Sequence, residues 1–201
     1  MATDSSGAGN DGLLIGGTSY EADTADGSPF SVRLDGASGL VDLGSLDAVG
    51  ELSLALWFNA DSFPGPSNDP RLISKASGEG ANDHVFMLST ICVGTATRLR
   101  ARVRVGGVTT TLVGSGDLLP GAWRHAALTH DGSTLRLYLD GLEVGAIPLP
   151  GVVDVDPSIS VAVGGQPIGA GSRHFDGLID DVRILQRALT AGEVQQLVQG
   201  R

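Results

Sequence analysis

The sequence is poor in the residues that most often carry chemistry or cross-links. Its 201 residues include one cysteine, one lysine and five glutamates, and only 4% are aromatic. The single cysteine, Cys92, excludes an internal disulfide, and the apolar run Val85–Val93 around it favours a buried, inert thiol. A catalytic thiol would need a paired histidine, which nothing in the sequence specifies.

The sequence also lacks long apolar runs and an excess of basic over acidic residues. No stretch approaches the roughly 18–20 apolar residues of a membrane span, so we expect no membrane insertion. No signal peptide precedes Asp4, so an export signal, if there is one, lies outside this sequence. The net charge of −10 argues against nucleic acid as a partner, because phosphate binding requires a basic patch.

What the sequence does contain is turn residues between short alternating runs. The clearest stretch, Gly121–Gly145, places Asp131-Gly132 between two runs and Asp140-Gly141 after the second. Asp-Gly between alternating runs indicates a β-hairpin, because glycine reaches positive φ without steric cost. Glu51–Asn59 carries apolar groups on both faces and predicts a central, doubly covered strand. Pro29–Leu34 and Gly39–Leu43 predict a second hairpin-like unit.

Thr97–Val105 alternates strictly and carries four arginines on one face. This row could bind an anionic ligand. The interpretation that we favour is a solvated outer face whose charges meet neighbouring aspartates.

The end of the chain predicts a last strand within His174–Leu185 and then a short helix. Thr190 and Glu193 have the spacing of a capping box, and Leu189 and Val194 stand where a hydrophobic staple forms. About a dozen short strands with one C-terminal helix predict an all-β fold, a two-sheet antiparallel sandwich, as a single domain over residues 1–201.

Several segments resemble laminin-G-like domains of the concanavalin A-like lectin/glucanase superfamily. The hairpin WRHAALTHDGSTLRLYLDGLEV is similar to the core pattern of these domains, and FDGLIDDVRILQRALTAGEVQQL is similar to their closing pattern. ELSLALWFNADSF, RLISK and DSSGAGNDG resemble further family segments, so the likeness runs from Asp4 to Leu197. The resemblance implies a jelly-roll sandwich.

The resemblance also implies a metal site. In this superfamily a Ca²⁺ is often held where the N-terminal loop meets the closing strand, which nominates Asp4, Asn10 and Asp180, with the carbonyl of Gly7 completing the set. Carboxylate, amide and peptide oxygens are the ligands that Ca²⁺ prefers. Such an ion would be structural and would tie the two ends together. The alternative is an Asp180 satisfied by backbone amides.

One departure from the family concerns the start of the chain. The family usually has a strand before the DSSG loop, whereas only Met1–Thr3 precede Asp4 here. A missing strand would leave a sheet edge unpaired, and an unpaired edge invites pairing with another chain or an oligomer.

For function, the residues favour binding over catalysis. Glycosidases need two flanking carboxylates, and among the five glutamates only Glu21 has an acidic residue two positions away, Asp23. Sugars stack on exposed aromatics; Tyr20 and Phe63 are the candidates, because Trp57, Trp123 and Tyr138 occupy positions that look like core. We therefore expect a non-catalytic module for carbohydrate or another extracellular or cell-surface ligand. The alternative is a protein-interaction or assembly module, and a polysaccharide hydrolase or lyase is less favoured.

Overall fold

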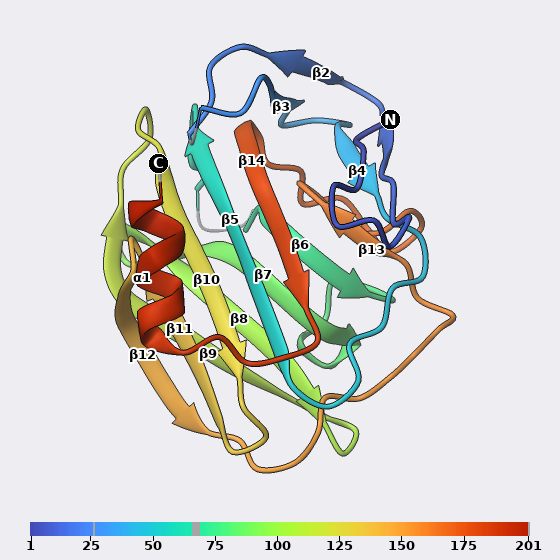
Figure 1. Ribbon diagram of the computed structural model, residues 1–201, viewed down its shortest axis with the longest axis vertical. Helices are drawn as coiled ribbons and strands as arrows, with labels where there is room; N and C mark the ends of the chain where they lie inside the picture. Colours follow the sequence, from blue (N-terminus) through green and yellow to red (C-terminus); the bar gives the residue numbers. More distant parts are fainter. Residues whose placement is uncertain (26, 66–68, 201) are drawn as a thin grey trace.

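The computed structural model describes residues 1–25, 27–65 and 69–200, and its strands form two seven-stranded antiparallel sheets packed face to face (Figure 1). The first sheet has the order β1 (Leu13–Ile15), β4 (Leu40–Asp42), β13 (Val161–Val163), β6 (Arg71–Ala76), β7 (His84–Val93), β8 (Ala96–Val105) and β9 (Val108–Leu118). The second sheet has the order β12 (Leu142–Pro148), β11 (Thr134–Leu139), β10 (Arg124–His130), β5 (Leu52–Ala60), β14 (Asp176–Leu185), β3 (Ser31–Asp35) and β2 (Thr18–Glu21). The predicted two-sheet sandwich is confirmed.

The Gly121–Gly145 stretch forms the expected strand pairs. β10 pairs with β11 from Ala126↔Leu139 to His130↔Leu135, and β11 continues into β12. Between β11 and β12, Asp140 and Gly141 have φ values of 51° and 80°, the two consecutive positive values that a tight hairpin turn matching the strand twist requires.

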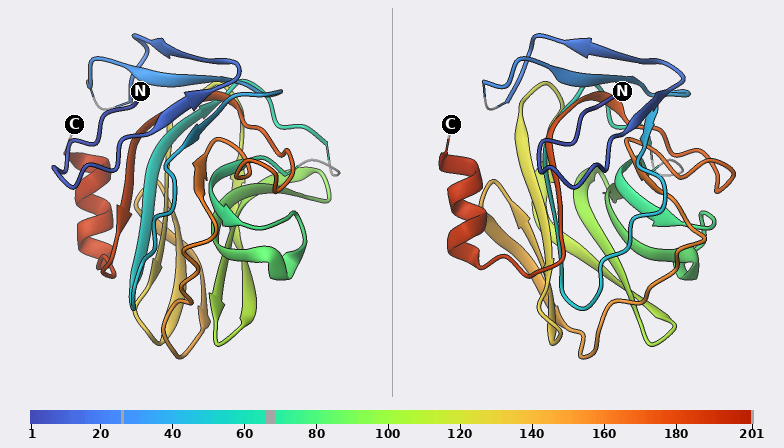
Figure 2. Two further views of the ribbon diagram at one scale, coloured as in Figure 1. Left: turned by 90° about the vertical axis from the view of Figure 1, so that its right-hand side faces the viewer. Right: turned by 45° about the vertical axis from the view of Figure 1, so that its right-hand side comes forward.

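β5 is central, as predicted. It pairs with β10 on one side and β14 on the other, and every residue from Leu52 to Phe58 is buried. One face contributes to the core between the sheets. The opposite face is covered by the helix α1 (Ala191–Gln199) and the residues just before it: Val194 of the helix and Leu189 pack on Ala55, Ala127 and Tyr138. Figure 2 shows this helix outside the second sheet.

The start of α1 follows the predicted capping box. The amide of Glu193 donates to the Thr190 hydroxyl at 3.2 Å, and the amide of Thr190 donates to the Glu193 carboxylate at 2.8 Å. Among the described residues, no helix is long and apolar enough to cross a membrane.

One strand prediction was wrong. The segments around Asp35-Gly36 do not form a hairpin, because β3 pairs with β2 and β14 whereas β4 pairs with β1 and β13 in the other sheet. The Asp35 carboxylate accepts the amides of residues 37, 38 and 39, which holds a sharp turn that carries the chain across the sandwich. Later in the chain, the 152–163 segment contributes the three-residue β13 and a bridge at Val153.

Cys92 is not the buried thiol that its apolar neighbours indicated. It lies near the end of β7, where the residues of that strand are no longer buried, and it is partly exposed. The apolar pattern placed the strand correctly but did not show where the facing sheet ends.

Candidate functional site

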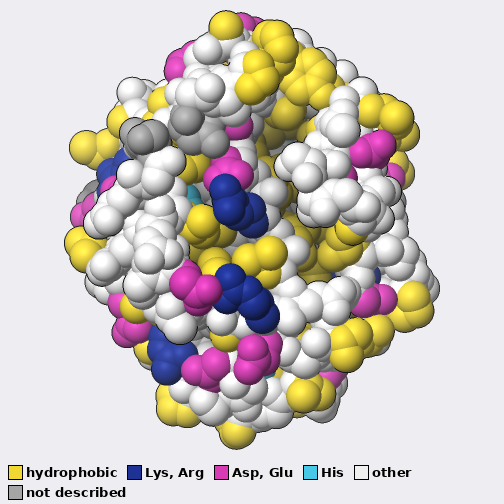
Figure 3. All heavy atoms as spheres, in the orientation of Figure 1, with side chains coloured by type: hydrophobic (Ala, Val, Ile, Leu, Met, Phe, Trp, Pro, Cys, Tyr) yellow, Lys and Arg dark blue, Asp and Glu magenta, His cyan; other side chains and the backbone are white. Residues whose placement is uncertain are grey.

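A cleft of about 880 Å³ opens on one side of the sandwich, between the N-terminal loop and β14. β14 lines it continuously from Ile179 to Leu185, and residues 2–6 line the opposite side. Its apolar lining includes residues that belong to the core or pack against it: Val32, Val41, Leu43, Leu46, Ile179 and Ile184. Figure 3 shows hydrophobic side chains at the bottom of this hollow.

The N-terminal loop is organised around Asp4. Its carboxylate accepts the amide of Ser6 at 2.9 Å and the amide of Asn10 at 2.9 Å, while its own amide donates to Asp11 at 2.7 Å. Hydrogen bonds from the Ser6 side chain and from the backbone of Asn10 and Ser6 lower the pKa of Asp4 to about 2. Asp4 is therefore a charged residue that shapes its loop.

Asp180 belongs to a different hydrogen-bond network across the cleft. Its carboxylate accepts the Ser28 hydroxyl at 3.0 Å, the amide of Ala25 at 3.1 Å and the amide of Asp181 at 2.8 Å. These bonds fasten the segment before β3 to β14. Asp181, with a φ of 45°, forms an ion pair with Arg183 at 2.9 Å.

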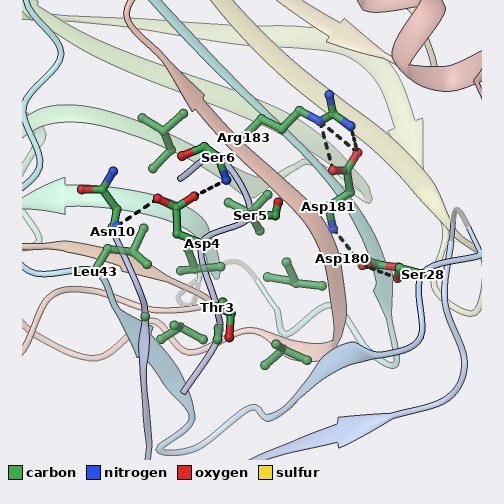
Figure 4. Close-up of a pocket in the computed structure, with 18 of the residues that line it drawn as sticks. Thr3, Asp4, Ser5, Ser6, Asn10, Ser28, Leu43, Asp180, Asp181 and Arg183 are labelled. Carbon is green, nitrogen blue, oxygen red and sulfur yellow. Dashed lines mark hydrogen bonds and ion pairs between the residues drawn. The ribbon is translucent and has the colours of Figure 1, made fainter. Parts of the chain in front are cut away.

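The structure thus brings together some of the predicted metal ligands. Asp4 and Asn10 share one hydrogen-bonded loop, and Gly7 is an exposed turn residue with a φ of 80°. In Figure 4 the Asp4 carboxylate points toward Ser6 and Asn10, whereas that of Asp180 points toward Ser28. Within the described ranges no group of three or more His, Cys, Asp or Glu residues could hold a metal ion. The Ca²⁺ site stays a prediction.

An aromatic pair stands at the mouth of the cleft. Tyr20 in β2 and Phe30 before β3 are 44% and 58% exposed, and their ring centroids lie 6.0 Å apart. The Tyr20 hydroxyl donates to the carbonyl of Met1 at 2.6 Å, which fixes the ring against the N-terminal segment. Both rings line the cleft together with polar groups of the loop and of Ser28. The sequence interpretation included Tyr20 and missed Phe30, because the residue follows a proline in an apparent strand.

The other aromatic predictions had mixed outcomes. Trp57 and Tyr138 are buried as expected, whereas Trp123 is half-buried and its indole donates to Asp23 at 2.9 Å. Phe63 is partly buried and packs against the core, so it does not form an exposed platform. Phe63 begins a proline-rich stretch of the sequence, of which residues 66–68 lie outside the described residues.

The arginine face of β8 is not a solvated surface. Arg100 and Arg102 are only 5% and 9% exposed, although Arg98 and Arg104 do pair with nearby aspartates as predicted. The middle of this face is covered by the segments that contain Asp69 and Gly80, which contact Arg100 and Arg102 respectively. The alternation predicted the strand, but the covering loops come from distant parts of the chain.

Asp69 is the centre of the buried ion network on that face. It pairs with Arg71 at 2.6 Å, with Arg173 at 3.3 Å and with Arg100. Burial alone would raise the pKa of Asp69, but the charges of Arg71 and Arg100 outweigh it and hold the pKa below its ordinary value. Nearby, burial and the arginine charges lower the pKa of His84 to about 4, so this buried imidazole is neutral at pH 7.

The family model described as the concanavalin A-like lectin/glucanases superfamily (Laminin_G_3) matches residues 35–195. The chain belongs to this family. It is also similar to the zebrafish (Danio rerio) adhesion G-protein coupled receptor V1, with 25% identity over 158 residues that make up 72% of this chain and 2% of that protein. The chain therefore spans a very small part of that curated relative.

Solved structures share the fold at low sequence identity. Domain 4 of AbnA, an extracellular arabinanase from Geobacillus stearothermophilus in complex with arabinotriose, aligns with a TM-score of 0.74 at 22% identity, covering 98% of this chain and 92% of that one. The CBM40 of a Ruminococcus gnavus IT-sialidase, bound to α2,3-sialyllactose, aligns with a TM-score of 0.66 at 16% identity, covering 84% and 96%. These likenesses show the fold.

Proposed function

We propose that this chain is a non-catalytic binding module that recognises carbohydrate on an extracellular or cell-surface ligand. The observation that carries the proposal is the exposed pair Tyr20–Phe30 at the mouth of the cleft. Pyranose rings pack their apolar faces on aromatic side chains, and loop carboxylates, amides and hydroxyls fix their orientation. Ser28 and Asn10 line the same cleft and supply such polar groups.

The carboxylates of the cleft support binding rather than catalysis. A general acid needs a pKa near the working pH, whereas the pKa of Asp4 is lowered to about 2. The Asp180 carboxylate accepts hydrogen bonds from Ala25, Ser28 and Asp181 among the described residues, so it serves the fold. Two of the similar structures are domains in complex with an oligosaccharide, which supports the same assignment, and one of these domains belongs to an extracellular arabinanase.

A glycan array tests this proposal. We expect the wild-type chain to bind at least one glycan, and the double variant Tyr20→Ala/Phe30→Ala to lose that signal while keeping its melting temperature. Leu142→Ala, which truncates an exposed apolar residue on β12 far from the cleft, is the matched control and should bind normally. Running the array with and without Ca²⁺ shows whether recognition needs the ion. No signal from the wild type would refute the proposal and favour the protein-interaction alternative.

A further inference from the structure

Arg102 in β8 is a buried arginine without a carboxylate partner. In the part of the chain that the structure describes, every other arginine and the one lysine form an ion pair with an aspartate or a glutamate, whereas Arg102 forms none. Only 9% of Arg102 is exposed. Because a buried charge is normally paired, this guanidinium is a candidate for binding an anion from outside the chain.

Arg102 lies on the outer face of the first sheet. Leu99, Ala101 and Val103 of β8 belong to the core, so strand alternation directs Arg102 away from it. Figure 2 shows the first sheet on the side of the sandwich away from α1. Neither Arg102 nor its neighbour His84 lines the cleft that carries the glycan proposal. The arginine therefore belongs to a separate place in the molecule.

The hydrogen-bonding capacity of this pair is not used up within the fold. Nη1 of Arg102 donates to the carbonyl of Gly80 at 3.4 Å and lies 3.2 Å from Nδ1 of His84, which is fully buried. Nε of Arg102 and Nε2 of His84 are buried, and neither has a hydrogen-bond partner among the described residues. The tautomer with its proton on Nε2 makes His84 a second donor, while Nδ1 accepts from Arg102. Unpaired buried donors are costly, so a ligand that accepts from them is favoured.

Positive charge exceeds negative charge around Arg102. Asp69 is already shared by three arginines, and Glu79 pairs with Arg173. Burial and the charges of Arg100 and Arg71 lower the pKa of Arg102 to about 10, so it stays charged at pH 7, and an added negative charge would relieve the repulsion. The cluster as a whole has four arginines and three carboxylates: Arg71, Arg100, Arg102 and Arg173 with Asp69, Glu79 and Asp83.

We propose that Arg102, with His84 beside it, binds an oxyanion: a carboxylate, sulfate or phosphate group, either free or carried by a larger molecule. A guanidinium presents its N–H groups in a planar fork that matches two oxygens of such a group. The row of arginines on β8 thus includes one member that serves a ligand, while the others pair with aspartates of the chain. The site shares no residue with the cleft, so it is independent of the glycan proposal.

Thermal melting tests the site with sodium sulfate as the probe and sodium chloride holding the ionic strength constant. An anion at about ten times its Kd should raise the melting temperature by about 3–6 °C. The rise should saturate in the wild type and be absent in Arg102→Met, which keeps an apolar side chain and removes the donors. Arg98→Met is the matched control and should keep the rise, because Arg98 lies on the same face of β8 and already pairs with Asp117 at 3.0 Å.

A second measurement uses the wild type and does not depend on how the variants fold. In an NMR titration, sulfate should shift the ring signals of His84 saturably and leave those of His130 unchanged, because His130 is buried in β10 of the other sheet. Titrations with glucuronate and glucose identify the source of the oxyanion. Binding of sulfate and glucuronate, but not glucose, would show that the group is recognised on a sugar as well, and binding of sulfate alone would assign the site to a free inorganic ion.

Three results would overturn the proposal: an equal rise of the melting temperature in the wild type and Arg102→Met, His84 signals that do not move with sulfate, or binding of glucose as tight as that of glucuronate. The double variant Tyr20→Ala/Phe30→Ala should keep the full response to sulfate. Failure of the glycan proposal and failure of this one are therefore distinguishable.

Discussion

Replacing Asp69 by asparagine should destabilise the chain far more than any surface ion pair would. Asp69 is the shared carboxylate of Arg71 and Arg100, whose side chains are 1% and 6% exposed, and of Arg173. The substitution keeps the shape of the side chain and removes its negative charge. The buried guanidinium groups of Arg71 and Arg100 then lack a carboxylate to neutralise them. Breaking a buried pair in this way costs about 3–5 kcal/mol. Since the amide can still accept a hydrogen bond, we expect about 3 kcal/mol.

The assay is urea and thermal unfolding of the variant beside a matched control. Asp61→Asn removes the same charge from the ion pair with Arg33, whose two side chains are 36% and 42% exposed, and should cost less than about 1 kcal/mol. For a chain of this length 3 kcal/mol corresponds to a lower melting temperature by about 6–12 °C. Equal losses for the two variants would refute the claim that the arginine face is buried and depends on Asp69.

The remaining predictions concern pH and metal. The pKa of His84 is about 4 in the folded chain and 6.5 in its ordinary state. Between these two values the unfolded chain binds more protons than the folded one. The free energy of unfolding therefore falls as the pH drops from 6.5 to 4, by about 3 kcal/mol. His84→Gln should flatten the stability profile between pH 7 and pH 4, and an unchanged slope would contradict the assignment. For Ca²⁺, we predict that adding the ion raises the melting temperature and that EDTA or Asp180→Asn removes the increase; identical melting curves with and without EDTA would exclude a structural ion.

Local patterns in the sequence determined much of the fold. Alternation and Asp-Gly turns placed β10, β11 and β12, and the doubly apolar Glu51–Asn59 run correctly predicted a central strand. The capping box predicted where α1 begins. These signals are readable because strand periodicity, turn conformation and helix capping each depend on residues a few positions apart.

Features that depend on distant segments could not be predicted. The arginine row of β8 was expected to be solvated because alternation identifies two faces of a strand and does not show which loops cover them. The aspartate that neutralises Arg100 lies 31 positions earlier in the chain. The candidate site also depends on distant segments. The sequence nominated the Asp4 loop and Asp180 as ligands of one site, yet in the structure their carboxylates belong to separate hydrogen-bond networks. Phe30 was missed because it follows a proline in an apparent strand, whereas it lies just before β3 and is exposed.

The most direct test of the central claim is a calorimetric titration of the array-selected glycan into the wild type, Phe30→Ala and Leu142→Ala. If Tyr20 and Phe30 form the binding surface, Phe30→Ala should weaken the affinity by roughly tenfold, the loss expected for one stacking aromatic ring, and Leu142→Ala should leave it unchanged. Equal affinity of Phe30→Ala and the wild type would contradict the account.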